Sequence, residues 1–272
     1  MGSDESFGPV GQVFMMKLFT AAALALAMAL ALPHSGASAP AGDEILVSAA
    51  ISLKNAFEEI GSAFEKGTGV RVRLNLGASG LLQKQIESGA PVDVFASAGE
   101  KQMDVLQAQG FILPETRRNF ARNVLVLVVP ARSSLPIHSF ADLANPRVER
   151  VAIGNPKTVP AGQYAREALT KLKVWDGLQS RLVLAENVRQ VLDYVARGEV
   201  EAGFVYASDV PAAHGEVSTA ANAPEDAHEA ILYPLAVVQG TGNRGNAQRF
   251  IDWTLGKSGQ SILAKHGFLN PR

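Results

Sequence analysis

The segment EILVSAAISLKNAFEEIGSAFEKGTGVRVRLNLGASGLLQKQIESGAPVDVFASA, residues 44–98, alternates between two kinds of hydrophobic pattern. Its runs at 44–50, 70–78 and 92–98 are short and apolar or alternating, which is typical of strands. The intervening runs, 53–69 and 80–91, carry apolar residues at helical spacing. Strands and helices in this order predict an α/β fold, in which helices cover a parallel sheet.

The same alternation restarts after a strongly apolar run at 123–130. Further strand-like and helix-like runs then follow in turn: 150–155, 162–172, 181–186, 188–199 and 202–209. An apolar strand at 230–238 and two helices within 245–268 close the chain. The chain therefore contains two similar β-α halves.

Two similar halves predict two lobes, each a mostly parallel sheet flanked by helices. The strands at 123–130 and 230–238 are the expected crossings, so two chain passages join the lobes. We expect residues 42–122 plus 232–272 to form the first lobe and residues 123–231 to form the second. The segment 211–230 is expected to be an irregular surface excursion.

Residues 1–41 are expected to be a leader that is removed. A charged start at Lys17, an apolar run at 18–32 and the small-residue stretch HSGASAPAG form the pattern of a secretory signal peptide. The apolar run is shorter than the roughly 20 residues of a membrane-spanning helix, so a membrane anchor is the less favoured interpretation. Cleavage after Ala41 fits the small-x-small rule, and the mature protein is expected to be exported.

The charge balance and the absence of cysteine exclude several classes of function. The chain has 25 Lys and Arg against 26 Asp and Glu residues, a formal net charge of −1. A nucleic-acid partner would require a basic surface, so none is expected. The absence of cysteine excludes disulfides, a thiolate nucleophile and a thiolate metal site. The four histidines after the leader are scattered, so no site for a free metal cation is expected.

Open α/β sheets bind ligands at the carboxyl ends of their strands, where the next helices begin. A helix N-terminus offers unpaired N–H groups and a positive dipole end to an anion. An N-cap serine also keeps its hydroxyl hydrogen free to donate. We expect Ser52 and Ser79 to be N-caps at the first two junctions. The full set of candidates at the junctions and at one strand end is Ser52, Ser79, Ala161, Val188 and Tyr206. These residues predict an oxyanion site that is built from neutral donors.

The third junction, within NPKTVPAGQYAREAL, lacks the polar residue that normally caps a helix. Pro160 gives up an N–H group that would be unpaired in any case. Gly162 removes bulk, so the amide of Ala161 is expected to stay open. The alternative is that the two serines are simple caps and that the other three candidates are ordinary helix or packing residues.

After the leader, the whole chain resembles the periplasmic molybdate-binding protein family, the solute receptor of the molybdate ABC transporter. The resemblance is strongest in SAAISLKNAFEEIGSAFEKGTGV, GASGLLQKQIESGAPVDVFASA, VAIGNPKTVPAGQYAREAL, KVWDGL, AENVRQVLDYVARGEVEAGFVYASD and EAILYPLAVV. It implies a two-lobed periplasmic binding protein fold of type II and a monomer in the periplasm. It also implies that molybdate or tungstate binds in the interlobe cleft and passes to an inner-membrane ABC transporter permease. Neither a cofactor nor an enzyme activity is implied.

The family's ligand contacts carry over by motif to the residues that the junctions indicate. Serine hydroxyls and amides at the first two junctions, amides at the next two and a tyrosine hydroxyl hold the oxyanion in that family. They correspond here to Ser52, Ser79, Ala161, Val188 and Tyr206. Gly80 departs from the pattern, since some members have a second serine there. This glycine either loosens the start of the second helix or lets the backbone come closer.

Other functions remain in competition with this interpretation. A receptor for sulfate, phosphate or a small organic anion is the alternative among binding proteins. A serine hydrolase is the main alternative among enzymes, although no G-x-S-x-G turn is present. A histidine within about 3.2 Å of Ser52 or Ser79 would favour a hydrolase. A transcription-factor effector domain shares the two-lobed architecture, but the signal peptide argues against it.

Overall fold

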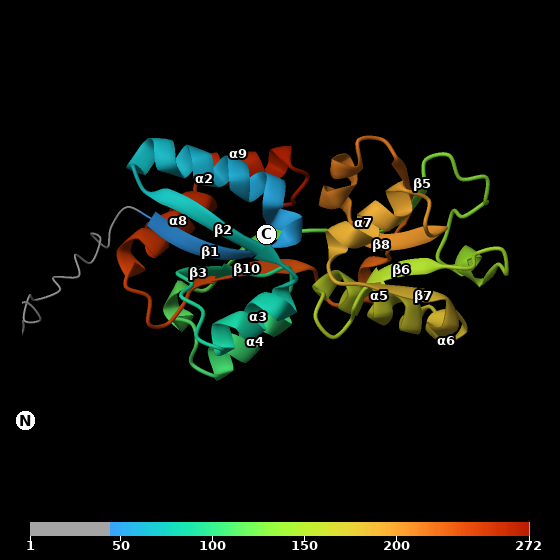
Figure 1. The fold of residues 1–272 in the computed structure, drawn as a ribbon, viewed down its shortest axis with the longest axis horizontal. Helices are drawn as coiled ribbons and strands as arrows, with labels where there is room; N and C mark the ends of the chain where they lie inside the picture. Colours follow the sequence, from blue (N-terminus) through green and yellow to red (C-terminus); the bar gives the residue numbers. More distant parts are fainter. Residues whose placement is uncertain (1–43, 272) are drawn as a thin grey trace, which may run out of the picture. The chain divides into compact units, whose positions relative to one another are not determined.

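The computed structural model describes residues 44–271 of the chain. The predicted leader, residues 1–41, lies outside this part. The described residues form two five-stranded sheets flanked by helices, which is the two-lobed α/β architecture that the sequence predicts (Figure 1). The first lobe is built on the sheet that contains β1 (Glu44–Ala50), and the second on the sheet that contains β6 (Val151–Gly154).

The first sheet has the strand order β2-β1-β3-β10-β4. Its other strands are β2 (Arg71–Gly77), β3 (Val94–Ala96), β4 (Arg118–Arg122) and β10 (Leu232–Val237). Its helices are α2 (Lys54–Thr68), α3 (Ser79–Glu87), α4 (Glu100–Ala108), α8 (Arg244–Leu255) and α9 (Lys257–Lys265). Helices α2 and α9 lie on one face of this sheet, and α3 and α4 lie on the other (Figure 1).

The second sheet repeats this arrangement with the strand order β7-β6-β8-β5-β9. Its other strands are β5 (Leu125–Pro130), β7 (Leu182–Ala185), β8 (Ala202–Tyr206) and β9 (Val217–Asn222). Its helices are α5 (Pro160–Lys171), α6 (Trp175–Leu178) and α7 (Val188–Ala196). The order β2-β1-β3 in one lobe thus matches β7-β6-β8 in the other.

Each sheet is mixed, and it contains more antiparallel pairing than the sequence pattern indicates. β1 is parallel to β2 and β3, and β6 is parallel to β7 and β8. The remaining pairs, which involve β10 in one sheet and β5 in the other, are antiparallel. The reason is that β5 and β10 lie beside the passages of the chain between the sheets and are not preceded by a crossover helix within their own sheet.

The chain passes from the first sheet to the second between β4 and β5, through Asn123 and Val124. It returns in the segment between β9 and β10. The lobe boundaries, 42–122 plus 232–272 and 123–231, stay a prediction. The expectation of an irregular excursion at 211–230 is wrong in part, because β9 pairs with β5. β9 is an edge strand with largely exposed residues, so it lacks the apolar pattern that marks the inner strands.

An aromatic cluster anchors α2 and α8 to the first sheet. The ring of Phe57 lies 5.6 Å from that of Phe120 and 5.9 Å from that of Phe250. The ring of Phe64 lies 5.4 Å from Phe250 in an edge-on contact. These side chains are fully buried, so the junction before α2 stands on a rigid helix.

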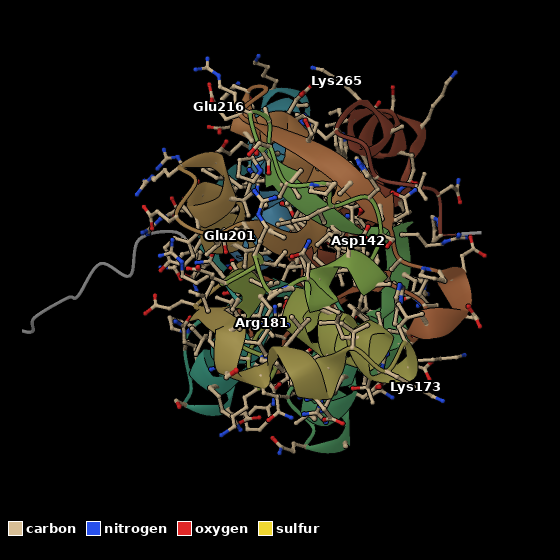
Figure 2. The ribbon with its side chains drawn as sticks, turned by 90° about the vertical axis from the view of Figure 1, so that its right-hand side faces the viewer. Asp142, Lys173, Arg181, Glu201, Glu216 and Lys265 are labelled. Atoms are coloured by element: carbon tan, nitrogen blue, oxygen red, sulfur yellow. The ribbon has the colours of Figure 1, made fainter. Side chains whose placement is uncertain are left out.

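Charged side chains cover the outside of the protein. Asp142, Arg181, Glu201 and Glu216 mark the side on which the second lobe lies, and acidic and basic groups are interspersed there (Figure 2). This mixture agrees with the near-zero net charge of the sequence. Within residues 44–271, no helix has the length and the apolarity that are needed to cross a membrane.

The two lobes touch through four polar contacts, one of which joins Gln102 Nε2 in α4 to Gln163 Oε1 in α5 at 3.4 Å. The amide of Gly80 donates to the carbonyl oxygen of Thr158 at 2.9 Å. Arg189 donates to Asn55 Oδ1 at 3.1 Å, and Tyr206 donates to the carbonyl oxygen of Ala98 (3.2 Å). Each contact joins a residue at or beside a helix start of one lobe to the other lobe. The lobes are therefore held close together where the helices begin.

Asp209 is a fully buried carboxylate that depends on Arg189. The Arg189 Nε donates to Asp209 Oδ1 at 2.6 Å, and Asp209 Oδ2 accepts the amide of Tyr206 at 3.2 Å. Burial raises the pKa of Asp209, and the Arg189 guanidinium partly offsets that rise. The ion pair thus fixes the start of the segment that follows β8.

Substitution of Gly162 by alanine is expected to destabilise the protein by about 3 kcal/mol. A β-carbon at this position would overlap the backbone carbonyl group of Gly154, which rigid strand β6 holds in place. The measurement is urea unfolding followed by circular dichroism. In the matched control, Gly67→Ala in α2, a β-carbon would meet no atom within 4 Å. That control should gain about 0.5 kcal/mol, and equal effects of the two substitutions would contradict this account.

Arg189→Met is expected to lower the free energy of unfolding by about 3 kcal/mol at neutral pH, because it leaves Asp209 buried and unpaired. Without the guanidinium, the pKa of Asp209 rises further above its unfolded value. The folded state then binds the proton more tightly than the unfolded state does. The free energy of unfolding therefore falls as the pH rises from the unfolded pKa of Asp209 to its folded pKa. The loss should therefore shrink at acidic pH, which denaturant unfolding between pH 5 and 8 measures. The control Arg197→Met removes an exposed partner of Glu199 and should cost less than about 0.5 kcal/mol.

Candidate functional site

Four helices begin at the carboxyl ends of two pairs of neighbouring parallel strands. Ala50, the last residue of β1, pairs with Gly77, the last residue of β2. In the same way Gly154, the last residue of β6, pairs with Ala185, the last residue of β7. The chain therefore leaves each strand pair side by side, and the following turns present their backbone N–H groups to a shared space.

All five residues predicted from the sequence line one cavity between the lobes. Their exposed fractions are 3% or less. The lining consists of Ala50, Ile51, Ser52, Gly77, Ala78, Ser79, Ala98, Val159, Pro160, Ala161, Val188 and Tyr206. The cavity is small, with a volume of about 10 Å³ for water-sized contents, and none of its described lining residues carries a charge. Whether these residues bind an oxyanion stays a prediction.

The two serines are not helix caps, so the N-cap prediction is wrong. Ser52 lies in a short 3₁₀ turn, Ile51–Leu53, that precedes α2, and Ser79 is the first residue of α3. The Ser79 Oγ instead accepts the amide hydrogen of Ala98 at 3.1 Å. The Ser52 Oγ lies 3.2 Å from the hydroxyl of Tyr233. Both hydroxyls therefore bond to groups outside the helices at these junctions.

The start of α5 matches its sequence prediction. Val159 is the N-cap in an extended conformation, Pro160 is the first helical residue, and no side chain caps the helix. The amides of Gly162 and Gln163 bond to the carbonyl oxygen of Val159 (3.0 and 3.1 Å). Within residues 44–271, no oxygen accepts the amide hydrogen of Ala161. Ala161 is buried and belongs to the lining of the cavity.

The start of α7 is capped, which the sequence analysis missed. The side chain of Asn187 accepts the amide hydrogen of Gln190 at 3.0 Å. An asparagine directly before a helical pattern is the signal that could have revealed this cap. The cap uses the third amide of the helix, and in the described chain the amide of Val188 itself has no acceptor. The amide of Ser79 at the start of α3 is in the same situation.

Tyr206 is fully buried and contacts the opposite lobe. Its hydroxyl donates to the carbonyl oxygen of Ala98, whose amide donates to Ser79. Burial raises the pKa of Tyr206 well above its usual value, and the nearby Tyr233 adds to this rise. The hydroxyl therefore remains protonated at physiological pH, and in this structure its one hydrogen is directed to Ala98.

Two further polar residues behind the cavity were missed from the sequence. Tyr233 in β10 contacts Ser52, and Asn123 between β4 and β5 donates to the Tyr233 hydroxyl at 3.2 Å. Both are buried. The available signal was weak: a tyrosine within the otherwise apolar segment AILYPLAVV, and an asparagine before the apolar run at 124–129.

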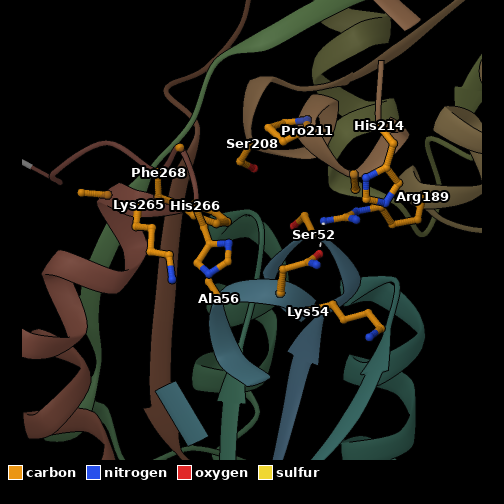
Figure 3. A pocket seen from close by; sticks show the side chains of 14 residues that line it. Ser52, Lys54, Ala56, Arg189, Ser208, Pro211, His214, Lys265, His266 and Phe268 are labelled. Carbon is orange, nitrogen blue, oxygen red and sulfur yellow. Dashed lines mark hydrogen bonds between the residues drawn. The ribbon is translucent and has the colours of Figure 1, made fainter. Parts of the chain in front are cut away.

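Basic side chains gather in a separate, wider groove of about 450 Å³ beside Ser52 (Figure 3). Their charges already have acidic partners. Arg189 pairs with Asp209, Lys54 pairs with Glu58, and Lys265 pairs with Glu59, which also forms a hydrogen bond with His266. The positive charge near the cavity is thus locally balanced, and the cavity itself presents neutral donors.

In the described part of the chain, neither Ser52 nor Ser79 has a histidine as a hydrogen-bond partner. Across residues 44–271, His, Asp and Glu side chains do not form a group of three or more that could hold a metal ion. What the cavity offers is a set of N–H and O–H groups.

The chain matches the bacterial extracellular solute-binding protein family over residues 45–269. It is 40% identical over 259 residues to the molybdate-binding protein of Escherichia coli K12, covering 93% of this chain and 97% of that protein. It is 33% identical to the molybdate-binding protein of Haemophilus influenzae, with coverage of 89% and 96%.

Among solved structures, the periplasmic molybdate-binding protein of Azotobacter vinelandii superimposes with a TM-score of 0.76 at 30% identity, covering 84% of this chain and all of that one. The sulfate-binding protein of Mycobacterium tuberculosis shares the fold at 19% identity, with a TM-score of 0.71 and coverage of 84% and 87%. The matching family consists of solute-binding transport proteins and is not a family of enzymes. This chain therefore belongs to the bacterial extracellular solute-binding proteins and, among them, to the molybdate-binding protein family that its motifs resemble.

Proposed function

We propose that this protein binds molybdate, and also tungstate, in the cavity between its lobes and delivers the anion to an ABC transporter permease. Ser52, Ser79, Ala161, Val188 and Tyr206 would hold the oxyanion through hydroxyl and amide hydrogens. One observation carries the proposal: buried backbone N–H groups at helix starts from both lobes surround an uncharged cavity. Buried donors of this kind normally have a partner.

A neutral cage of donors is strong enough for tight binding. A hydrogen bond to a charged group contributes roughly 1.5–3 kcal/mol. Five such bonds give about 8–15 kcal/mol before ordering costs, and nanomolar affinity requires about 12 kcal/mol. The positive ends of the helix dipoles add to this attraction. Paired cations in the neighbouring groove are not needed for it.

The cage also favours a fully deprotonated oxyanion. A ligand that carries an acidic O–H group needs an acceptor, and the described lining residues offer no carboxylate. Sulfate lacks such a group, so its exclusion would depend on size, because a smaller anion cannot reach donors on both lobes at once. A receptor for sulfate, phosphate or a small organic anion is the alternative that the experiment below addresses.

Closure of two lobes about the paired crossings would bring the donors together. We propose residues 42–122 plus 232–272 as one lobe and 123–231 as the other, with the hinge near Asn123 and between β9 and β10. Four polar contacts between the lobes support such a closed arrangement. The protein would act as a monomer in the periplasm, and the closed form would be the one that the permease recognises.

Titration with four anions tests this function. Molybdate and tungstate should raise the melting temperature at micromolar concentration, because a ligand that binds only the folded state stabilises it by mass action. Sulfate and phosphate should do so only at far higher concentration. Isothermal titration calorimetry on the same samples gives the affinities. Stabilisation by sulfate or phosphate at concentrations at which molybdate has no effect would overturn the assignment.

Gly80→Ala is expected to weaken molybdate binding about fivefold to a hundredfold, with little effect on the stability of the ligand-free protein. A β-carbon at this position would lie 2.6 Å from the carbonyl oxygen of Thr158 in the opposite lobe. Opening of the lobes relieves that overlap, so the substitution disfavours the closed form by about 1–3 kcal/mol. The matched control is Leu81→Ala, the next residue of α3, whose side chain is 45% exposed. Calorimetry should give the control an affinity within about twofold of the original, and an unchanged affinity for Gly80→Ala would show that this approach is not needed for binding.

A further inference from the structure

The side-chain amide of Asn123 is held in one orientation by four hydrogen bonds. Its Oδ1 accepts the backbone amides of Val124 at 2.9 Å and Ser208 at 3.4 Å. Its Nδ2 donates to Ser208 Oγ at 2.7 Å and to the Tyr233 hydroxyl at 3.2 Å. Backbone N–H groups can only donate, so the oxygen must face them. Both Nδ2 hydrogens are then committed to the two hydroxyl oxygens.

This orientation limits how the next hydrogen bond can be made. The Tyr233 hydroxyl accepts a hydrogen from Asn123 and has a single hydrogen of its own to donate. The neighbouring hydroxyl of Tyr206 is directed to the carbonyl oxygen of Ala98. Besides Asn123, the group in hydrogen-bonding geometry with the Tyr233 hydroxyl among residues 44–271 is Ser52 Oγ, at 3.2 Å, and either hydroxyl of this pair could be the donor. Because a buried hydroxyl hydrogen normally has an acceptor, the arrangement in which Tyr233 donates and Ser52 accepts leaves the Tyr233 hydrogen paired. In this arrangement the Ser52 hydroxyl receives a hydrogen from Tyr233.

We propose that Asn123 and Tyr233 are positioning residues, which direct the hydroxyl hydrogen of Ser52 into the cavity. The inference rests on the proposed function, since it concerns how Ser52 meets an oxyanion. An isolated serine hydroxyl can present either its hydrogen or a lone pair to a ligand. A lone pair that faces an anion would repel it. With Tyr233 as the fixed donor behind it, Ser52 presents its hydrogen.

The second serine is set in the same way by a different donor. Ser79 Oγ accepts the backbone amide of Ala98, which cannot reverse its role. Its own hydrogen is therefore also left for the cavity. The two serines thus share one device, in which a donor behind the oxygen sets the polarity in front of it. At Ser79 the donor is backbone, and at Ser52 it is a side-chain relay that mutation can remove.

The surroundings of Tyr233 keep its hydroxyl protonated and its ring in place. The side chain is fully buried, and burial raises the pKa of its hydroxyl well above the usual value. Its ring packs edge-on against the rings of Phe120, Phe268 and Tyr206, with centroids 5.4–6.2 Å away. Removal of the hydroxyl oxygen alone should leave the ring in place, so Tyr233→Phe is a conservative test.

A double-mutant cycle with molybdate as the probe separates positioning from a general effect on structure. Calorimetry is performed on the original protein, Ser52→Ala, Tyr233→Phe and the double variant. We expect Ser52→Ala to weaken binding about tenfold to a hundredfold, and Tyr233→Phe to weaken it about threefold to tenfold. In the Ser52→Ala background, Tyr233→Phe should change the affinity by less than about twofold, because the group on which it acts is gone.

The control for a lost buried hydroxyl is Tyr164→Phe. Tyr164 is 7% exposed, belongs to α5 and does not line the cavity. The affinity of the Tyr164→Phe variant for molybdate should therefore stay within about twofold of that of the original protein. If Tyr233→Phe weakens binding by the same factor in both backgrounds, or leaves it unchanged in the original one, the positioning role is wrong although the proposed function stands. If the original protein does not bind molybdate, the proposed function fails and the positioning role fails with it.

A second variant guards against loss of folding in Tyr233→Phe, which circular dichroism and thermal unfolding would reveal. Asn123→Ala leaves Tyr233 in place but removes the donor that fixes its direction. It should weaken binding in the original protein and have little effect in the Ser52→Ala background. Equal factors in the two backgrounds would contradict the relay as directly as the Tyr233 cycle does.

Discussion

The register of two parallel strand pairs determines which backbone N–H groups meet at the cavity. Because β1 ends beside the end of β2, and β6 beside the end of β7, four turns leave the sheets at matched heights. The first N–H groups of each following helix have no partner within the helix. A shift of one residue in either pair would turn the side chains of one strand to the opposite face and would carry its turn out of line. The backbone N–H groups of Ser79, Ala161 and Val188 thus meet as a consequence of strand pairing. The apolar side chains of Ala161 and Val188 contribute little more than the shape of the cavity.

At the lobe boundary, the cavity presents neutral hydrogen-bond donors, whereas the charged side chains lie in the neighbouring groove and are paired. An unpaired lysine or arginine in so small a cavity would be costly to bury without its ligand. Backbone amides and hydroxyls carry a smaller desolvation cost, so they can be buried in advance in a fixed arrangement. The cations of the neighbouring groove are held by Asp209, Glu58 and Glu59. Their pairing leaves hydrogen-bond geometry, rather than net charge, as the property that would select a ligand.

The sequence was sufficient to predict the two-lobed α/β class, the alternation of strands and helices, and the five residues that meet at one cavity. These features follow from hydrophobic periodicity and from the rule that helix starts gather at strand ends. The absence of capping by Ser52 and Ser79 could not be predicted, because their partners lie 181 and 19 residues away in the chain. The strand at 217–222 was missed because an exposed edge strand carries little apolar pattern. Tyr233 and Asn123 were missed because their partners lie 181 and 110 residues away in the chain.

Small residues at the lobe boundary link the fold to the proposed closure. At Gly80 the backbones of the two lobes approach closely enough for an amide of one to bond to a carbonyl of the other. A side chain at this position would hold the lobes apart, and the donors on α3 and α5 would then be too distant to share one small anion. Arg189 and Tyr206 add longer contacts across the same boundary, but a long side chain can follow a moving partner, whereas a backbone contact cannot. The departure of Gly80 from the family pattern is therefore best understood as close approach of the backbone rather than as a loosened helix start.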